Sequence, residues 1–150
     1  MGPVNSIIKP YHAVQFYASN ERLFSTVAGF LAEGLIDGQP SLVISTPSHR
    51  AGILAQLSAR LIDVERARRE GDLLLLDSHE MLDLFMWEGR PDPNAFNANI
   101  GRFIEQTLQG RPGSTLRAYG DMVNVLWTQG QRAAAVKLEV LWNTPGLRFG

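Results

Sequence analysis

The chain has 150 residues, of which 45% are hydrophobic, and its formal net charge at pH 7 is -1. Such a chain can bury one sizeable core, and its near-neutral charge does not favour a nucleic-acid or membrane partner. The absence of cysteine excludes disulfides, thiol catalysis and thiolate metal sites. Because no apolar run reaches the ~20 residues that span a bilayer, and residues 1–9 lack the apolar core of a signal peptide, we expect a cytoplasmic protein.

The N-terminal part predicts a leader, a strand and a helix. Residues 1–10 predict a flexible leader, and residues 12–17 predict the first strand. Ser19 or Asn20 can cap the following helix, in which apolar residues recur at helical spacing until Gly38 ends it.

The next part predicts a second strand and a second helix. Residues 41–45 form a short β-branched run, and Ser48 can cap the helix after it. The apolar residues expected on the inner face of that helix are Ile53, Leu54, Leu57 and Leu61. Residues 63–70 predict a charged helical turn, where acidic and basic residues alternate as on a solvated surface.

A third strand and two helices are predicted in the middle of the chain. Residues 72–77 form an apolar run between two aspartates, which is typical of a strand buried on both faces. Ser78 can cap the next helix, and Gly89 ends it. Asp92 and Pro93 then give a clear helix start, with a cap residue followed by proline at the first helical position.

The last third predicts one more strand and two more helices. A turn at residues 110–113 leads into an apolar strand that ends at Tyr119, Gly120 and Asp121, where Gly120 lets the backbone turn sharply. One helix follows directly, and the last helix is expected over residues 132–142. Strands alternating with helices predict a three-layer α/β/α fold with a mostly parallel central sheet of four main strands and about six helices.

The sequence contains no assembled catalytic set. It has no Gly-x-x-x-x-Gly-Lys-Ser/Thr phosphate loop, no Gly-x-Gly-x-x-Gly after the first strand and no Gly-x-Ser-x-Gly elbow. His12, His49 and His79 lie at element boundaries without the spacing of metal ligands. We therefore predict a protein that is not an enzyme and has no catalytic residue, metal site or cofactor.

Polar side chains do gather where the predicted strands end. In an open α/β sheet, ligands bind in the crevice beyond the carboxyl ends of the strands. The stretch from Arg117 to Asp121 predicts an arginine, a phenol and a carboxylate at such an end. The residues expected to line the ligand crevice are His12, Gln15, Tyr17, Thr46, Asp77, Phe85, Met86, Arg117, Tyr119, Asp121 and Trp127.

Several of these residues have a second, structural interpretation. Asp77 and Asp121 can orient a polar ligand or a cation, or they can cap the helices that follow them. His12 and Gln15 can make a structural hydrogen bond within the sheet. The aromatic and methionine side chains can form a pocket wall or an ordinary core.

Six short blocks of the sequence carry a resemblance to a known family. The blocks are His12-Ala-Val-Gln-Phe-Tyr17, Ser45-Thr-Pro-Ser-His-Arg50, Leu74-Leu-Leu-Asp77, Phe85-Met86 with Gly89-Arg-Pro-Asp-Pro93, Arg117-Ala-Tyr-Gly-Asp-Met122 and Leu138-Glu-Val-Leu-Trp-Asn143. In this order they resemble the MEDS domain, the methanogen/methylotroph sensory domain of DcmR-type regulators. The resemblance covers residues 11–143, between the leader and a tail at residues 144–150.

The resemblance implies a fold similar to RecA and KaiC that lacks the nucleotide-binding loop (Walker A). It implies a sensory module that binds a small molecule, hydrocarbon derivatives included, and signals to a histidine kinase or a transcription regulator. The chain departs from the family where residues 144–150 replace a further apolar segment with turn residues, and it carries no output domain. These departures favour a module that acts through another protein and not on nucleic acid directly, with a homodimer formed through an incomplete sheet edge.

Three functions from different classes follow. The first is a non-enzymatic sensor whose ligand binds in the crevice. The second is a protein-interaction or dimerisation module with a vestigial crevice and an apolar surface near Trp142. The third is a cryptic nucleotide-binding protein in which Asp121 holds a metal, although the chain offers no phosphate loop.

Overall fold

The computed structural model describes residues 19–142 as a mixed α/β structure. The expected leader, the first strand and the tail lie outside the described residues. In chain order the elements are α2 (Asn20–Ile36), β1 (Ser41–Ser45), α3 (Pro47–Ala59), α4 (Val64–Arg69), β2 (Leu73–Asp77), α5 (Ser78–Phe85), β3 (Met86–Trp87), β4 (Arg90–Pro91), α6 (Pro93–Leu108), β5 (Arg117–Gly120), α7 (Met122–Thr128) and α8 (Arg132–Trp142). The predicted alternation of strands and helices is confirmed over this range.

The described sheet has three parallel strands in the order β2-β1-β5, with β1 in the centre. Ser41 at the start of β1 pairs with Leu73 on one side and with Arg117 on the other. All three strands therefore end at the same edge, called here the carboxyl edge. A separate antiparallel hairpin, β3–β4, follows α5.

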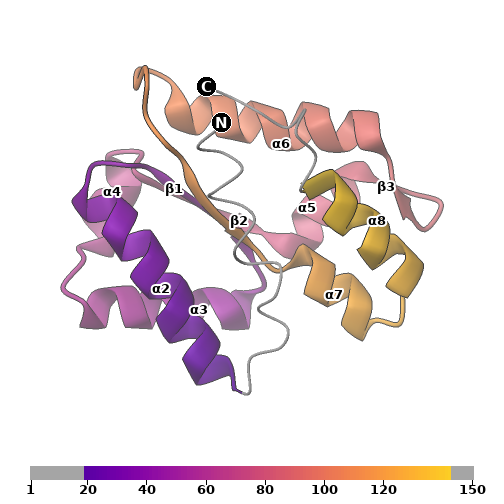
Figure 1. Ribbon diagram of the computed structural model, residues 1–150, viewed down its shortest axis with the longest axis horizontal. Helices are drawn as coiled ribbons and strands as arrows, with labels where there is room; N and C mark the ends of the chain where they lie inside the picture. Colours follow the sequence, from indigo (N-terminus) through magenta and orange to yellow (C-terminus); the bar gives the residue numbers. More distant parts are fainter. Residues whose placement is uncertain (1–18, 143–150) are drawn as a thin grey trace.

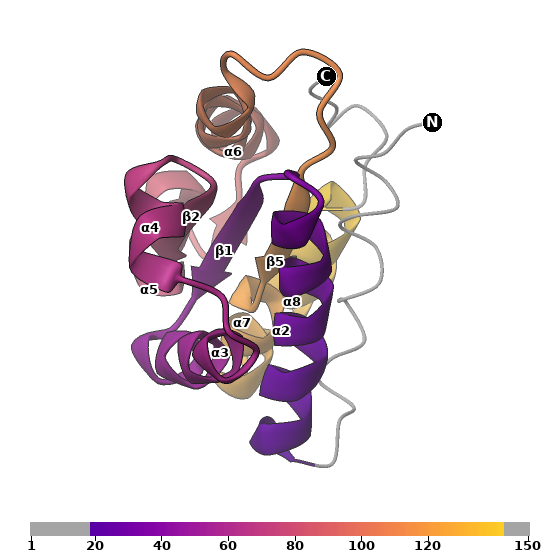
Figure 2. The same ribbon diagram turned by 90° about the vertical axis from the view of Figure 1, so that its left-hand side faces the viewer.

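Apolar side chains pack on both faces of β1, because successive residues of a strand point to opposite faces. Leu42 and Ile44 belong to a cluster with α5, α6, α7 and α8, whereas Val43 belongs to a cluster with α2, α3 and α4. Figure 1 shows these two groups of helices on either side of the strands, and Figure 2 shows α2 and α3 packed beside β1. The complete three-layer arrangement similar to RecA and KaiC stays a prediction, since residues 12–17 lie outside the described range.

Helix starts follow the predicted chemistry, with two corrections, one of which is that Asp77 and not Ser78 caps α5. Asp92 caps α6 by accepting a hydrogen bond from the backbone N–H of Ala95, and Pro93 is the first helical residue. The prediction that Ser48 caps the second helix is wrong. Thr46 is the cap of α3, because Pro47 already has the fixed backbone angle of a first helical residue.

Two burial predictions are corrected. Leu61 does not face the core: it lies beyond the end of α3 at a positive φ of 67° and is 93% exposed. The strand at residues 73–77 is confirmed, but Leu73 is buried and the rest of β2 is half-buried, since β2 is at the edge of the described sheet.

The helices of the described range are too short or too polar to cross a bilayer.

Candidate functional site

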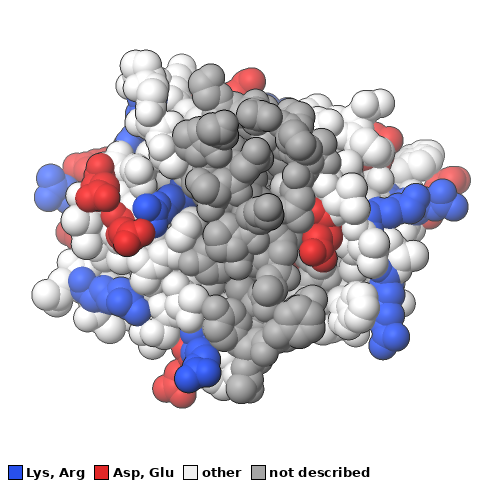
Figure 3. Space-filling view, viewed as in Figure 1, with Lys and Arg blue, Asp and Glu red and all other residues white. Residues whose placement is uncertain are grey.

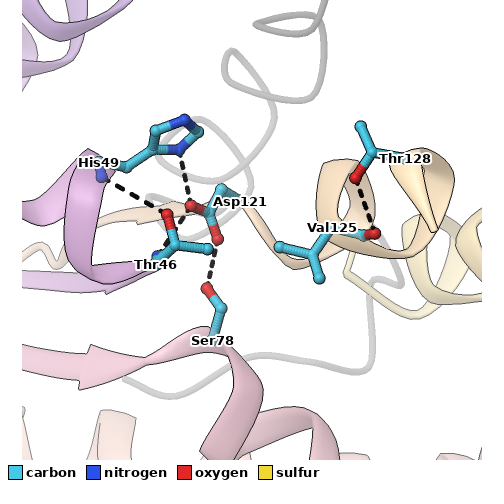
Figure 4. Close-up of polar contacts among 6 residues, drawn as sticks. All are labelled: Thr46, His49, Ser78, Asp121, Val125 and Thr128. Atoms are coloured by element: carbon cyan, nitrogen blue, oxygen red, sulfur yellow. Dashed lines mark hydrogen bonds and ion pairs between the residues drawn. The ribbon is translucent and has the colours of Figure 1, made fainter.

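The carboxylate of Asp121 is the centre of a hydrogen-bond network at the carboxyl edge (Figure 4). Its Oδ2 accepts from the backbone N–H of Thr46 at 3.0 Å and from Nδ1 of His49 at 2.8 Å. Its Oδ1 accepts from the hydroxyl of Ser78. We call Thr46, His49, Ser78 and Asp121 the edge network.

The edge network joins the ends of all three strands. Thr46 follows β1, Ser78 follows β2 and Asp121 follows β5. The backbone N–H of Asp121 also donates to the carbonyl of Ile44 at 3.0 Å, which holds the β5 corner against β1. A single carboxylate therefore connects three segments that are far apart in the sequence.

The two connections after β1 and β5 diverge at this point. The chain leaves β1 into α3, which packs on one face of the sheet, and leaves β5 into α7, which packs on the other. Such a divergence is a topological switch point, where open α/β sheets bind their ligands. The contact between His49 and Asp121 crosses it.

Burial decides which members of the network a ligand can reach. Asp121 is 2% exposed and three donors already occupy its oxygens, so it is poorly placed to bind a further group. The His49 side chain is 16% exposed, and its second ring nitrogen points away from Asp121 (Figure 4). Phe24 contacts the same imidazole edge to face, with ring centroids 5.5 Å apart. The side chains at which a ligand can reach this site are therefore His49 of the edge network and Phe24 next to it.

The tautomer of His49 follows from its partner. An ionised carboxylate only accepts hydrogen bonds, so Nδ1 must be the donor to Asp121. In a neutral imidazole the second nitrogen, Nε2, is then an acceptor. With a neutral imidazole, the site therefore presents a hydrogen-bond acceptor beside the aromatic ring of Phe24.

The network does not have the arrangement of a serine hydrolase triad. The Ser78 hydroxyl bonds to the carboxylate and not to the imidazole, whereas a nucleophilic serine needs a general base within hydrogen-bond reach. Among residues 19–142, no three His, Asp or Glu side chains come together as a metal site. Both Ser78 and Asp121 are buried, so their hydrogen bonds fix the edge of the sheet.

The prediction that Arg117 lies at the carboxyl end of its strand is wrong. Arg117 pairs with the first residue of β1, so it is at the opposite end, about 13 Å along the strand from Asp121. Its guanidinium donates to the carbonyl of Phe30 and to Glu33, and its Nε donates to Gln39. Arg117 ties the start of β5 to α2 and its C-terminal loop.

Tyr119 lies in β5, two residues before Asp121, but its side chain is in the interior of the protein. It is fully buried in the cluster of α2 and α3, so its side chain is not on an accessible surface. Burial raises the pKa of the Tyr119 phenol well above its usual range, and the carboxylate of Asp121 raises it further.

Other predicted crevice residues have structural roles. Asp77 caps α5 by accepting from the backbone N–H of Glu80 at 3.0 Å, which confirms the capping interpretation. Phe85 is buried against Phe96, and Met86 packs against the same cluster. Trp127 is 42% exposed, and the guanidinium of Arg132 is over its ring. His12, Gln15 and Tyr17 lie outside the described residues.

Of the predicted residues, Thr46 and Asp121 are in the edge network, and His49 and Ser78 were missed. Both missed residues are in the first turn of a helix that follows a strand, at α3 and α5. A polar side chain in that position points back toward the carboxyl edge, and this signal was available in the sequence.

Gly120 has a different role from the predicted one. Its backbone angle is not among the positive φ values of the described glycines, so no sharp turn requires it. A Cβ at this position would lie 3.1 Å from the ring of Trp142. Glycine lets the last residue of α8 pack directly against the end of β5.

Residues 11–146, nearly the whole chain, match the family model described as MEDS, the methanogen/methylotroph, DcmR sensory domain. No curated protein and no solved structure matches the chain.

Proposed function

The chain belongs to the MEDS family of sensory domains, and from this premise we propose that it is a non-enzymatic cytoplasmic sensor that binds a small organic molecule at the carboxyl edge. The bound state regulates a partner protein, a histidine kinase or a transcription regulator. The parallel order of β2, β1 and β5 also supports the proposal that the fold derives from a RecA/KaiC-like ancestor. The absence of cysteine suits a reducing compartment.

The contact between His49 and Asp121 across the switch point is the observation that carries this proposal. It lies where ligands of open α/β sheets bind, and it connects two segments that lead to opposite faces of the sheet. A ligand that contacts His49 acts on both segments together. A change in this contact can therefore alter the positions of α3 on one face of the sheet and α7 on the other.

The exposed chemistry of the edge network suggests the ligand class. Nε2 of His49 can accept a hydrogen bond, and the ring of Phe24 next to it can contact an apolar body. A short apolar molecule with one hydroxyl or amine group fits both features. Alcohols and amines derived from hydrocarbons are the class that we propose.

The packing connects the site to the last two helices, α7 and α8. Asp121 directly precedes α7, α7 packs against α8, and Trp142 of α8 packs against Gly120. A ligand shifts this unit only if it binds one arrangement better than another. We propose that α7 and α8 carry the signal.

The proposal is tested by a thermal-shift screen of the full chain against short alcohols, amines, halogenated compounds and nucleotides with magnesium. A ligand that binds the folded state raises the melting temperature by mass action. We expect an alcohol or amine to raise it. Stabilisation by magnesium nucleotide alone would instead support the nucleotide-binding alternative.

Two matched histidine variants locate the ligand. His49→Asn keeps a side-chain N–H donor for Asp121 but removes the outward Nε2 acceptor. We expect it to lose the ligand-induced shift, whereas His79→Asn, at an exposed position of α5, should retain it. A full shift in His49→Asn would show that the ligand binds elsewhere.

A protein-interaction module is the second candidate function, and one observation favours it. The described surface includes an apolar groove beside α8, and no residue of the edge network lines it. The screen separates the two candidates, because an interaction module with a vestigial crevice gains no stability from any small molecule.

A further inference from the structure

A groove of about 610 Å³ lies between the β3–β4 hairpin and the outer face of α8. Its apolar lining consists of Trp87, Pro91, Pro93, Val136, Val140 and Leu141. Trp87 is 71% exposed, Val140 62% and Val136 55%, and these are three of the seven large hydrophobic side chains exposed in the described range. Exposed apolar residues that gather in one place indicate an interaction surface.

The outer face of α8 is unusual for a solvated helix. Ala134, Ala135 and Leu138 face the core, whereas Val136 and Val140 form a stripe on the opposite side at i and i+4 spacing. Valine is a poorer helix former than lysine or glutamate, so solvation alone does not favour it there. The stripe is suited to packing against another apolar surface.

The opposite wall of the groove is well defined. Trp87 is in the hairpin, whose turn residues Glu88 and Gly89 have positive φ values of 51° and 78°. Two consecutive positive φ values are typical of the tight two-residue turn that matches strand twist. The turn therefore holds Trp87 in place at the side of the groove.

The charged residues around the groove have complementary signs on its two walls. Glu88 and Asp92 are on the hairpin side together with Arg90, and Lys137 is on the helix side. None of these four takes part in the ion pairs found within residues 19–142. Figure 3 shows acidic and basic side chains next to each other on the side of the molecule where the hairpin and α8 lie.

We propose that this groove binds a second copy of the chain, with α8 of each copy packed against the hairpin of the other. A two-fold axis places α8 of one copy against the hairpin of the other, and the reverse. Val136 and Val140 of each copy then contact Trp87 of the other copy. The same axis brings Lys137 near Glu88 of the other copy. A second copy of the chain therefore buries the apolar lining of the groove and also pairs its charged residues.

The test is sedimentation velocity of the full chain over about a hundredfold range of concentration. The wild type should show a monomer–dimer equilibrium, and Val140→Asp should weaken dimerisation at least about tenfold, since it places charge in the apolar contact. Ile36→Asp is the matched control, because Ile36 is 74% exposed on α2 and does not line the groove. Far-UV circular dichroism checks that each variant is folded.

Charge reversal tests the arrangement of the two copies. Lys137→Glu and Glu88→Lys should each weaken the dimer, and the double variant should recover most of the loss. A wild type that is monomeric at every concentration would overturn the proposal and leave the groove for a different protein. Dissociation by Ile36→Asp as strong as by Val140→Asp would also overturn it, as would a double reversal that recovers nothing.

Discussion

The two ends of β5 each carry a polar network, centred on Arg117 at the amino end and on Asp121 at the carboxyl end. Arg117 contacts α2 and the loop that follows it, so it joins one strand to one helix and its connection. Asp121 joins the ends of three strands and contacts two helix starts. The first network is local, whereas the second holds together the whole edge at which a ligand would bind.

Residues that are close in the sequence of β5 do not share a site. Arg117 and Asp121 are four positions apart, and this spacing suggested a common crevice. A strand separates such residues by about 13 Å, so one network stabilises the sheet while the other faces the switch point.

Asp121→Ala should have the largest effect on stability. The substitution leaves the hydroxyl of Ser78, the N–H of Thr46 and the ring N–H of His49 without their common acceptor. A buried donor left without an acceptor costs about 1–3 kcal/mol, so we expect the three donors together to cost about 3–5 kcal/mol. Urea unfolding should show this loss, with Asp77→Ala as the control, since a lost helix cap costs about 1 kcal/mol. Equal losses for the two variants would contradict the central role of Asp121.

Features that depend on neighbouring residues could be predicted from the sequence, whereas contacts between distant segments could not. Helix starts such as Asp92 and Pro93 are local, because cap and first residue are adjacent in sequence, and they were predicted correctly. The bond between His49 and Asp121 joins residues 72 positions apart and depends on strand register, which no local pattern shows. Thr46 and Asp121 were found because they follow strands directly.

Arg117→Ala should have an intermediate effect. The variant removes hydrogen bonds to Phe30, Glu33 and Gln39 and the stacking of the guanidinium over the ring of Phe30, 4.9 Å from its centroid. We expect a loss of about 2 kcal/mol in the free energy of unfolding, because the Arg117 side chain is 16% exposed.

The control for Arg117 is Arg111→Ala. Arg111 pairs with Asp72 at a more exposed position, where an ion pair contributes about 1 kcal/mol or less. Arg117→Ala should also leave any ligand-induced thermal shift unchanged. A lost ligand response with a preserved fold would mean that the amino end of β5 takes part in sensing after all.

The buried phenol of Tyr119, near the carboxyl end of β5, makes the stability of the protein depend on pH. The pKa of this phenol is raised by burial and by Asp121, so the folded state retains a proton that the unfolded chain loses above about pH 10. The stabilisation is complete below that pH and declines as pH rises toward the folded pKa, by at most about 1.4 kcal/mol per pH unit. In Tyr119→Phe this part of the slope should be absent in urea titrations between pH 9 and pH 11. Identical slopes for the variant and the wild type would show that the phenol ionises normally in the folded protein.

Thr46→Ala should have the smallest effect, although Thr46 belongs to the edge network. Its contribution to the carboxylate is a backbone N–H, which alanine retains. The substitution removes only the side-chain cap of α3, and that hydrogen bond to the N–H of His49 is long, at 3.4 Å. We expect a loss of about 0.5 kcal/mol, compared with about 1 kcal/mol for Asp92→Ala, whose cap distance is 2.9 Å. A larger loss for Thr46→Ala would mean that the cap also orients His49 toward Asp121, and the ligand response should then weaken in the same variant.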